Sequence, residues 1–497
     1  MKLNAAQALT SGHDPQRPAL VCGAQCLTYG ELPVQVAKAA AVWRDRGLEP
    51  GDRVAIQLPD GPDWVLAFLG AIWAGGVAVG VNPRIPDEDW RPMLAEAGFR
   101  HILANSADDV PAAHRDRAIE LTRWRPEVAA ATPMAPRLLD PDQPAFWTMS
   151  SGTSGRSKAI VHGQRAVLAV ESASVERLGL HADDRLFASS RLFFCYPLAN
   201  SLLAGLKIGA TVILDPAWPT PAGVIATLAA QRPTVFFSVP SFYRDLLRQG
   251  LAPRVAALGV RLCVSAGEGL PAGLREAWRA QTGLTIANGY GASETLTLAL
   301  IDDVGDGDLR PSPDVRITPV DAAAAHDDAM PTAIHIRTPT LALGYWQRAD
   351  AQAQAFRDGG YAPADLFTGA ATGRWHHAGR EDALVKVHGR WVDLAELDER
   401  LACCPGVREA ACVLVPDADG LDTIVLFCVP AHAEAADVDD TVRRQVAGWP
   451  AHQRPSRVNV LAALPRTATG KLLRRKLVAL QTQADARRAA PLDRTHR

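Results

Sequence analysis

Short runs of apolar and β-branched residues recur along the chain, and most are followed by stretches whose apolar positions have helical spacing. Such runs occupy residues 53–58, 77–81, 211–214, 235–239 and 261–265. Strands with so few polar positions are typical of parallel sheets that helices cover on both faces. The pattern predicts an α/β fold whose large N-terminal domain contains mostly parallel sheets with helices. Residues 302–330, rich in Asp, Gly and Ala, are expected to supply loops of a β subdomain.

The best candidate for a domain boundary is Gly379-Arg380-Glu381-Asp382. Beyond it the pattern predicts a strand, a helix with Leu394, Leu397 and Leu401 on one face, and two further strands at 410–415 and 423–429. These elements suit a small α+β domain of about one hundred residues. We expect an N-terminal domain at 1–380, a mobile C-terminal domain at 381–485 and a disordered polar tail at 486–497.

Composition narrows the function further. The chain has 497 residues, 48% of them apolar, and a formal net charge of −2, which gives no reason to expect nucleic acid as a partner. The long uncharged stretch at 64–81 is split by Gly75-Gly76, so a buried helix and strand are expected rather than a membrane span. The eight cysteines are scattered, which is typical of reduced thiols. We expect a cytoplasmic protein that is a monomer or a homodimer. Residues 104–145, which are rich in Pro, Asp and Ala, are expected to form a surface connection.

Three short motifs carry the candidate chemistry. The first, Ser150-Ser151-Gly152-Thr153-Ser154-Gly155-Arg156-Ser157-Lys158, follows a predicted strand and offers hydroxyls, backbone N–H groups and a lysine to a polyphosphate. It lacks the Gly-Lys-Ser/Thr ending of a Walker A loop. The second motif, Asn288-Gly289-Tyr290-Gly291-Ala292-Ser293-Glu294, places a carboxylate after a small-residue turn. The third, Pro465-Arg466-Thr467-Ala468-Thr469-Gly470-Lys471, brings a lysine from the far end of the chain.

In this order and spacing, the motifs resemble the signature of the adenylate-forming (ANL) superfamily, which includes acyl-CoA ligases, peptide-synthetase adenylation domains and luciferases. The resemblance implies an enzyme that uses ATP and Mg²⁺ to convert a carboxylic acid to an acyl-AMP with release of pyrophosphate. It implies catalytic roles for Lys471, Glu294 and Ser293, with Glu294 holding Mg²⁺. The implied nucleotide-binding residues are Ser151, Gly152, Thr153, Ser154, Gly155, Lys158, Ala266, Gly267, Glu268, Asn288, Gly289, Tyr290, Asp365 and Arg380.

The resemblance also implies a rotation of the C-terminal domain between two half-reactions. Asp382 matches the hinge, Lys386 and Gly389 match a tunnel for a pantetheine thiol, and Lys471 serves adenylation only. The thiol belongs to coenzyme A or, as an alternative, to a phosphopantetheinyl acyl carrier protein loaded by a stand-alone adenylation enzyme.

The segment Leu192-Phe193-Phe194-Cys195-Tyr196-Pro197 resembles benzoate- and anthranilate-type CoA ligases most closely. The implied acid pocket comprises Phe194, Cys195, Tyr196, Pro197 and Thr297, and an aromatic acid is the expected substrate. Three positions depart from the family pattern: Ser157, Ala159 and Ala364. They keep open a catalytically degenerate homologue that binds nucleotide without turnover.

Overall fold

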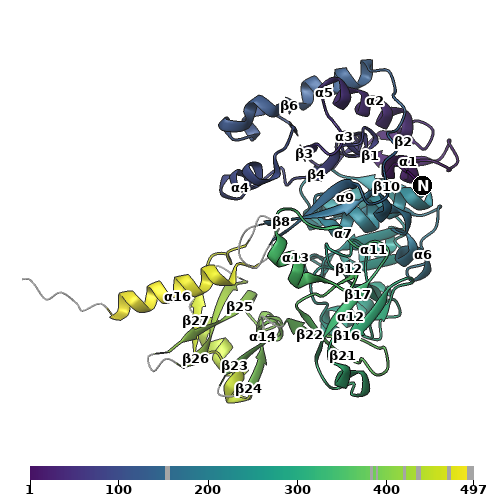
Figure 1. Ribbon diagram of the computed structural model, residues 1–497. Helices are drawn as coiled ribbons and strands as arrows, with labels where there is room; N and C mark the ends of the chain where they lie inside the picture. The colour runs from purple at the N-terminus through teal and green to yellow at the C-terminus, as the bar shows by residue number, and fades with distance from the viewer. Residues whose placement is uncertain are drawn as a thin grey trace, which may run out of the picture. The chain divides into compact units, whose positions relative to one another are not determined.

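The computed structural model describes residues 1–151, 157–380, 384–387, 390–417, 421–431, 438–466 and 472–489. The chain forms two compact units, which we call the large unit and the small unit. The large unit comprises Met1–Pro363 and Thr368–His376, and the small unit comprises Ala364–Phe367 and His377–Arg497 (Figure 1). The sequence predicts the boundary after residue 380, whereas the small unit also takes in the strand segment that contains Asp365.

A nine-stranded sheet forms one half of the large unit. Its strand order is β15-β14-β13-β12-β11-β9-β10-β1-β2. All neighbours from β1 to β13 are parallel, as the apolar runs predicted, and the antiparallel pairs lie toward the two edges. The strands are β1 (Pro18–Cys22), β2 (Gln25–Thr28), β9 (Arg185–Ala188), β10 (Thr211–Leu214), β11 (Val235–Ser238), β12 (Leu262–Ala266), β13 (Ile286–Tyr290), β14 (Leu300–Asp302) and β15 (Arg310–Pro311).

A seven-stranded sheet forms the other half, in the order β18-β8-β7-β4-β3-β5-β6. Its parallel strands are β3 (Arg53–Gln57), β4 (Val77–Gly80), β5 (His101–Ala104), β6 (Ala118–Glu120) and β7 (Pro144–Ser151). Strands β8 (Ser157–Gly163) and β18 (Gly344–Tyr345) extend it in antiparallel fashion. A smaller antiparallel sheet contains β16 (Arg316–Pro319), β17 (Thr332–Arg337), β19 (Phe356–Arg357) and β20 (Gly360–Tyr361).

Helix α3 (Pro62–Trp73) shows why the uncharged stretch at 64–81 does not span a membrane. Every residue from Trp64 to Trp73 is buried, and β4 follows after the turn at Gly75-Gly76. Burial of each large apolar side chain contributes roughly 1.5–3 kcal/mol. Among the described helices, none combines the length and apolar character that crossing a bilayer requires.

The segment at 104–145 is more structured than a surface connection. Helix α5 (Leu121–Ala130) buries Trp124 and Val128, and the Trp124 ring centroid lies 4.2 Å from that of Trp43 on α2 (Leu32–Asp45). Pro126 and several charged residues conceal the helical spacing in the sequence. Helices α2, α3 and α5 lie together at one end of the large unit (Figure 1).

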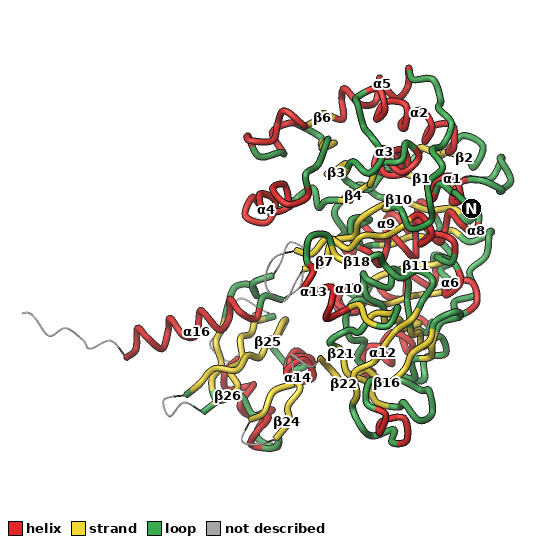
Figure 2. Tube along the Cα trace, in the orientation of Figure 1, coloured by secondary structure: helices red, strands yellow, loops and turns green. Residues whose placement is uncertain are grey.

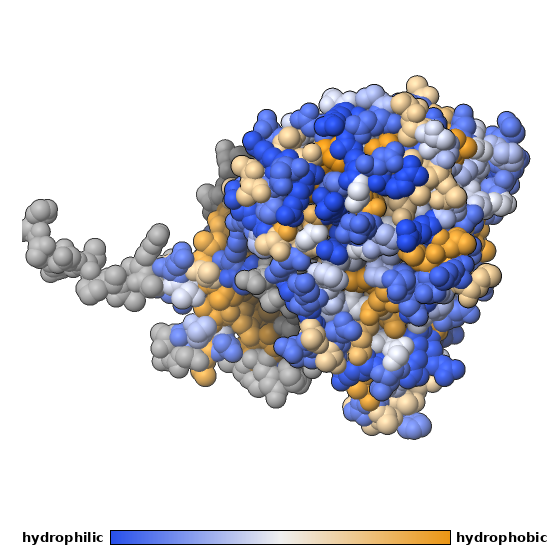
Figure 3. Space-filling view, turned by 45° about the horizontal axis from the view of Figure 1, so that its top comes forward, coloured by the Kyte–Doolittle hydropathy of each residue, from blue (hydrophilic) through white to orange (hydrophobic). Residues whose placement is uncertain are grey.

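The remaining helices of the large unit are α1 (Ala5–Thr10), α4 (Asp87–Ala97), α6 (Ser172–Glu176), α7 (Cys195–Pro197), α8 (Ala204–Ile208), α9 (Pro221–Gln231), α10 (Pro240–Arg248), α11 (Ala252–Ala257), α12 (Ala272–Thr282) and α13 (Ala349–Ala355). A π-helix, η4 (Leu198–Leu203), joins α7 to α8. Hydrophilic residues cover much of the visible face of the large unit, with apolar residues in scattered patches (Figure 3).

The small unit contains most of β21 (Asp365–Thr368) and β22 (His376–Arg380), the hairpin of β23 (Leu384–Val387) and β24 (Arg390–Asp393), and a sheet of β25 (Val407–Pro416), β26 (Asp422–Pro430) and β27 (Arg457–Val460). Its helices include α14 (Leu394–Ala402) and α16 (Arg474–Ala489), both labelled in Figure 2, and α15 (Val438–Val446). Leu394, Leu397 and Leu401 of α14 are buried, as their spacing predicted. Helix α16 runs to residue 489, beyond the expected start of a disordered tail at 486.

Candidate active site

Two segments of the expected nucleotide-binding residues lie at the carboxyl ends of β12 and β13. These strands are parallel neighbours, with Ser265 opposite Asn288 and Ala266 opposite Gly289. The chain turns sharply after β12 at Gly267, whose φ of +87° favours glycine. Strand pairing thus brings the predicted segments Ala266–Glu268 and Asn288–Tyr290 side by side, although they are distant in the sequence.

The amide of Asn288 suits a nucleobase. Its Oδ1 atom is buried and accepts no hydrogen bond from the described residues. Leaving a buried acceptor unpaired costs about 1–3 kcal/mol. An exocyclic amino group of adenine would supply the donor that this atom lacks.

Glu268 has a structural partner that the sequence did not indicate. Its carboxylate accepts hydrogen bonds from the backbone N–H and the hydroxyl of Ser241, both at 3.1 Å. Ser241 lies in the first turn of α10, where a negative charge stabilises the helix. The side chain of Glu268 therefore supports α10, and its backbone is what remains to face a nucleobase.

Glu294, the expected metal ligand, is nearly buried and is held by Tyr345. The Tyr345 hydroxyl donates to Glu294 Oε1 at 2.6 Å, and the backbone N–H of Ala342 donates to the Glu294 carbonyl at 2.9 Å. Burial and the Glu294 charge both raise the pKa of Tyr345, so the phenol stays protonated and remains a donor. A carboxylate used together with phosphate oxygens suits Mg²⁺, so this site fits the metal that the motif implies.

The predicted phosphate loop joins β7 to β8. These strands pair as a hairpin, with Ser150 opposite Lys158 and Ser151 opposite Ser157. Lys158 Nζ lies 5.1 Å from the centre of the Tyr345 ring, which places the lysine beside the Glu294 pair. Gly152, Thr153, Ser154 and Gly155 lie outside the described residues.

Ser293 adjoins a buried histidine on β8. His162 is fully buried, its Nε2 lies 3.1 Å from the Thr148 hydroxyl, and its ring stacks on Phe146 with a centroid separation of 4.9 Å. Burial lowers the pKa of His162 to about 3, and the backbone of Ser293 acts in the opposite direction. Burial thus keeps this histidine neutral beside the turn that carries Ser293 and Glu294.

The expected acid-pocket residues come together around α7. The Cys195 thiol donates to the carbonyl of Leu296 at 3.5 Å, which links this segment to the turn that follows Glu294. Leu296 has a φ of +65°, an unusual conformation for a non-glycine residue that often marks a functional site. The Tyr196 hydroxyl donates to the Val264 carbonyl at 3.0 Å, so its phenol is already bonded within the core.

Thr297 belongs to a buried group of threonine hydroxyls. Its Oγ1 lies 3.2 Å from that of Thr340, which donates to the Thr295 carbonyl at 2.7 Å. Because the Thr340 proton is used in that bond, Thr297 must donate to Thr340. The lone pairs of Thr297 can then accept a hydrogen bond from a ligand hydroxyl.

The small unit places two of the expected nucleotide-binding residues together. Arg380 on β22 lies 3.6 Å from the carboxylate of Asp365 on β21, and His377 Nε2 lies 3.2 Å from the same oxygen. Lys386 is part of β23, opposite Trp391 on β24. The expected hinge residue Asp382, the expected tunnel residue Gly389 and Lys471 lie outside the described residues.

The segments on both sides of Lys471 are fixed within the small unit. Arg466 forms a bridge with Leu472 and an ion pair of 2.6 Å with Glu409. Arg474, at the start of α16, binds the partly buried Asp398 at 2.8 Å. Burial raises the pKa of Asp398 to about 7, and Arg474 opposes that effect.

Comparison with known proteins agrees with this arrangement. Residues 8–346 match the family described as AMP-binding enzyme, and residues 396–471 match the AMP-binding enzyme C-terminal domain. The chain belongs to the AMP-binding enzyme family. This family, together with relatives named as CoA ligases, confirms the expectation of an AMP-forming acid–thiol ligase.

Several relatives in this family are named for aromatic acids. The chain is 36% identical over 493 residues to a 3-hydroxybenzoate–CoA ligase of Aromatoleum sp. (strain CIB), covering 93% of each chain. It is 30% identical to a benzoate–CoA ligase of Thauera aromatica, covering 90% of each. A benzoate CoA ligase structure from Burkholderia xenovorans LB400 aligns with a TM-score of 0.84 at 28% identity, covering 96% of this chain and 100% of that one.

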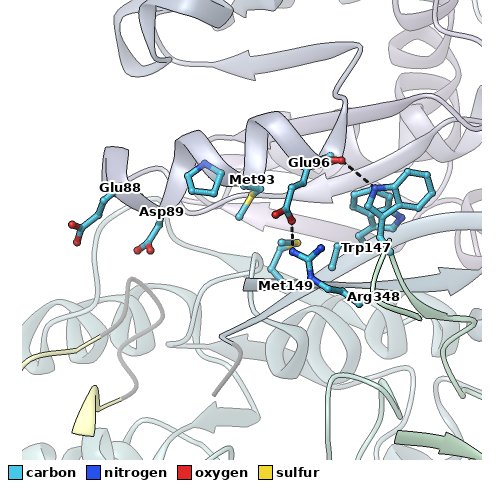
Figure 4. A pocket seen from close by; sticks show the side chains of 11 residues that line it. Glu88, Asp89, Met93, Glu96, Trp147, Met149 and Arg348 are labelled. Carbon is cyan, nitrogen blue, oxygen red and sulfur yellow. Dashed lines mark hydrogen bonds and ion pairs between the residues drawn. The ribbon is translucent and has the colours of Figure 1, made fainter. Parts of the chain in front are cut away.

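This member of the AMP-binding enzyme family also has a separate pocket of about 250 Å³ beside β7 and β8 (Figure 4). Helix α4 supplies Met93 and Glu96, and the opposite wall contains Trp147, Met149 and Arg348. Arg348 forms an ion pair with Glu96. None of the predicted acid-pocket residues lines this cavity.

Proposed function

We propose that the protein activates a benzoic acid that carries a ring hydroxyl, using ATP, and then transfers the acyl group to coenzyme A. The observation that carries this proposal is the buried hydroxyl group of Thr297, oriented by Thr340 and placed beside the turn that meets Cys195. A site built to bond a substrate hydroxyl discriminates strongly against an analogue that lacks it. The similarity to a 3-hydroxybenzoate–CoA ligase supports the same substrate class.

In the first half-reaction, a carboxylate oxygen of the acid forms a bond to the α-phosphorus of ATP, and the bond to pyrophosphate breaks. The acid and the triphosphate repel each other, so catalysis depends on placing positive charge and aligned groups between them. Lys158 at the base of the phosphate loop serves the phosphates, and Lys471 serves the acid carboxylate. Mg²⁺ held by Glu294 would neutralise charge on the phosphates when bound.

In the second half-reaction, a thiolate attacks the acyl carbonyl and AMP leaves with the electrons of the broken C–O bond. Lys471 has no role in this step. A rotation about Asp382 would exchange Lys471 for the face that carries Lys386 and Gly389, where the thiol enters. This exchange requires two separate motifs on the small unit, and the chain has one around Lys386 and another around Lys471.

A second acceptor is supported by one group of relatives. The chain is 30% identical over 467 residues to a p-hydroxybenzoic acid–AMP ligase FadD22 of Mycobacterium marinum, covering 91% of this chain but 65% of that protein. Its name gives an AMP ligase rather than a CoA ligase. Loading of a phosphopantetheinyl carrier protein is therefore the alternative to coenzyme A.

The test is acid-dependent pyrophosphate release over benzoate, its hydroxylated and aminated derivatives, aliphatic acids and amino acids, each with and without coenzyme A. Release with hydroxybenzoates, together with a thioester when coenzyme A is added, is the expected result. An adenylate without a thioester would favour a carrier protein. No release with any acid, although ATP binds, would replace the proposal with a degenerate nucleotide-binding homologue.

A further inference from the structure

The segment that carries the acid-pocket residues leaves the nine-stranded sheet and rests on the seven-stranded one. It begins three residues after β9 at Arg191 and passes the carboxyl end of β4. A Cβ atom added at Gly80, the last residue of β4, would lie 3.2 Å from the Cα atom of Phe193 and 2.8 Å from the Trp64 ring. The backbone at Phe193 therefore approaches β4 too closely for a side chain at position 80.

Asp60 holds the same segment from the neighbouring strand. It lies in the turn between β3 and α3, and both of its carboxylate oxygens are 3.2 Å from the backbone nitrogen of Leu192. The guanidinium group of Arg191 lies 3.6 Å from one of these oxygens. The exposed fractions of the two side chains are 7% and 8%, so solvent does little to screen the pair.

Arg191 is in turn fixed by the loop after β10. Its guanidinium donates to the carbonyl of Asp215 at 2.5 Å and lies 5.5 Å from the centre of the Trp218 ring. Arg84 lies over the same ring at 4.4 Å. Asp60 and Arg191 thus connect the ends of strands from both large sheets, immediately before Phe194, Cys195 and Tyr196.

We propose that Asp60 and Arg191 are positioning residues for the acid pocket, which set the place of Phe194, Cys195 and Tyr196 against the substrate ring. The proposal rests on the proposed function, because it takes these residues as the wall of the acid site. Neither Asp60 nor Arg191 touches the reacting atoms. Their effect is to fix the turn at Leu192 between the two sheets.

The two groups depend on each other. Burial raises the pKa of Asp60 to about 7, while Arg191 and the Leu192 N–H act to lower it, and Asp215 acts to raise it. Removing Arg191 would leave a buried carboxylate without its cation, which is strongly unfavourable for the ionised form. Loss of either partner is therefore expected to give the same change at the acid pocket.

The experiment compares Asp60→Asn, Asp60→Ala, Arg191→Met and the double variant Asp60→Asn/Arg191→Met in the full-length protein. Asp63→Asn is the matched control, because Asp63 is the next acid along the chain and pairs with Arg125 at the surface. Steady-state KM for a hydroxybenzoate, KM for ATP, kcat, and the thermal unfolding temperature are measured for each. Asparagine has the same shape as aspartate and retains one acceptor oxygen. The Asp60→Asn variant therefore still tests the proposal if Asp60→Ala does not fold.

We expect the KM for the acid to rise about tenfold in each single variant, with KM for ATP within about twofold of its starting value. The preference among acids with different ring substituents should change in parallel, and the double variant should lose less than the two single changes combined. Asp63→Asn should change none of these.

Equal changes in both KM values, or a lower unfolding temperature with both KM values unchanged, would overturn the positioning role. Failure of the underlying function is separate: it would show as no adenylate from any aromatic acid with the unaltered protein. If the unaltered enzyme is active and its KM for the acid is unchanged by both Asp60→Asn and Arg191→Met, only the positioning proposal is overturned.

Discussion

The hydroxyl of Tyr345 lies 2.6 Å from a carboxylate oxygen of Glu294, although 51 residues separate them in the sequence. Tyr345 belongs to β18, which pairs with β8 directly beyond the phosphate-loop hairpin. Through this contact the two motifs that we propose to serve phosphate and metal share one support. The orientation of Glu294 is therefore set by the edge of the seven-stranded sheet and not by its own turn alone.

Tyr345→Phe should weaken the metal-dependent step while leaving the fold intact. The variant removes the donor to Glu294 but keeps the ring beside Lys158. Loss of a partner that orients a metal ligand typically costs 10–100-fold in metal affinity or activity. We expect the Mg²⁺ concentration for half-maximal pyrophosphate release to rise about tenfold. Metal binding to the ATP-loaded protein, followed by calorimetry, gives a readout independent of turnover.

Tyr29→Phe is a suitable control for that measurement, because Tyr29 is also buried and its hydroxyl donates to the Ala210 carbonyl at 2.7 Å. It should lower stability modestly without changing the Mg²⁺ dependence. If both variants change the Mg²⁺ dependence equally, Tyr345 has no specific relation to the metal.

Thr297→Val should reduce selectivity for hydroxylated over unsubstituted benzoate. The variant keeps the size of the side chain and removes the acceptor that Thr340 orients. We expect the ratio of kcat/KM for hydroxybenzoate to that for benzoate to fall about tenfold, the effect of losing one substrate hydrogen bond. Thr282→Val removes a hydroxyl that bonds the Trp278 carbonyl on α12 and should leave the ratio unchanged. If the ratio is unchanged in Thr297→Val, Thr297 does not bind the ring hydroxyl of the substrate.

The fold could be predicted from the sequence because strands that are buried on both faces consist of nearly continuous apolar residues. Strand β10 occupies the predicted residues Thr211–Leu214, and β4 and β11 differ from their predictions by one residue. Helix α5 was missed because Pro126 and its charged neighbours obscure the helical period, and tertiary packing of Trp124 decides its structure. Local pattern therefore identified the sheets better than the peripheral helices.

The sequence predicted residues of the candidate site only where they fall within a continuous motif. Asn288 and Ala266 fall in recognisable runs, and strand pairing places them together. Tyr345, His162 and Asp60 act through contacts with residues far away in the chain, and none of the three lies in a motif. The only sign of these residues in the sequence is that each is a polar residue among apolar neighbours. Such a residue is more often part of the packed core than of a functional site.

Lys471→Ala should separate the two half-reactions. The resemblance assigns Lys471 to adenylation alone, so acyl-AMP formation should fall by orders of magnitude. Thioester formation from supplied acyl-AMP and coenzyme A should continue at a similar rate. Lys476→Ala, on α16, is the control. Rapid-quench assays of each half-reaction make the comparison, and equal loss in both would remove the assigned role.

His162 should make the stability of the large unit depend on pH. Burial lowers its pKa from 6.5 to about 3, so between these values the unfolded chain binds a proton that the folded chain does not. This histidine therefore makes the fold less stable as pH falls through 6.5 toward 3, by about 1.4 kcal/mol between pH 7.5 and pH 5.5.

His162→Gln should remove that part of the pH dependence, because glutamine stays neutral while keeping a polar group near Thr148. The free energy of unfolding of the large unit, measured by denaturant titration at pH 7.5 and at pH 5.5, should fall less in the variant than in the unaltered protein. His326→Gln, at an exposed position, should retain the full difference. If His162→Gln and the unaltered protein lose the same free energy between the two pH values, His162 is not held neutral by burial.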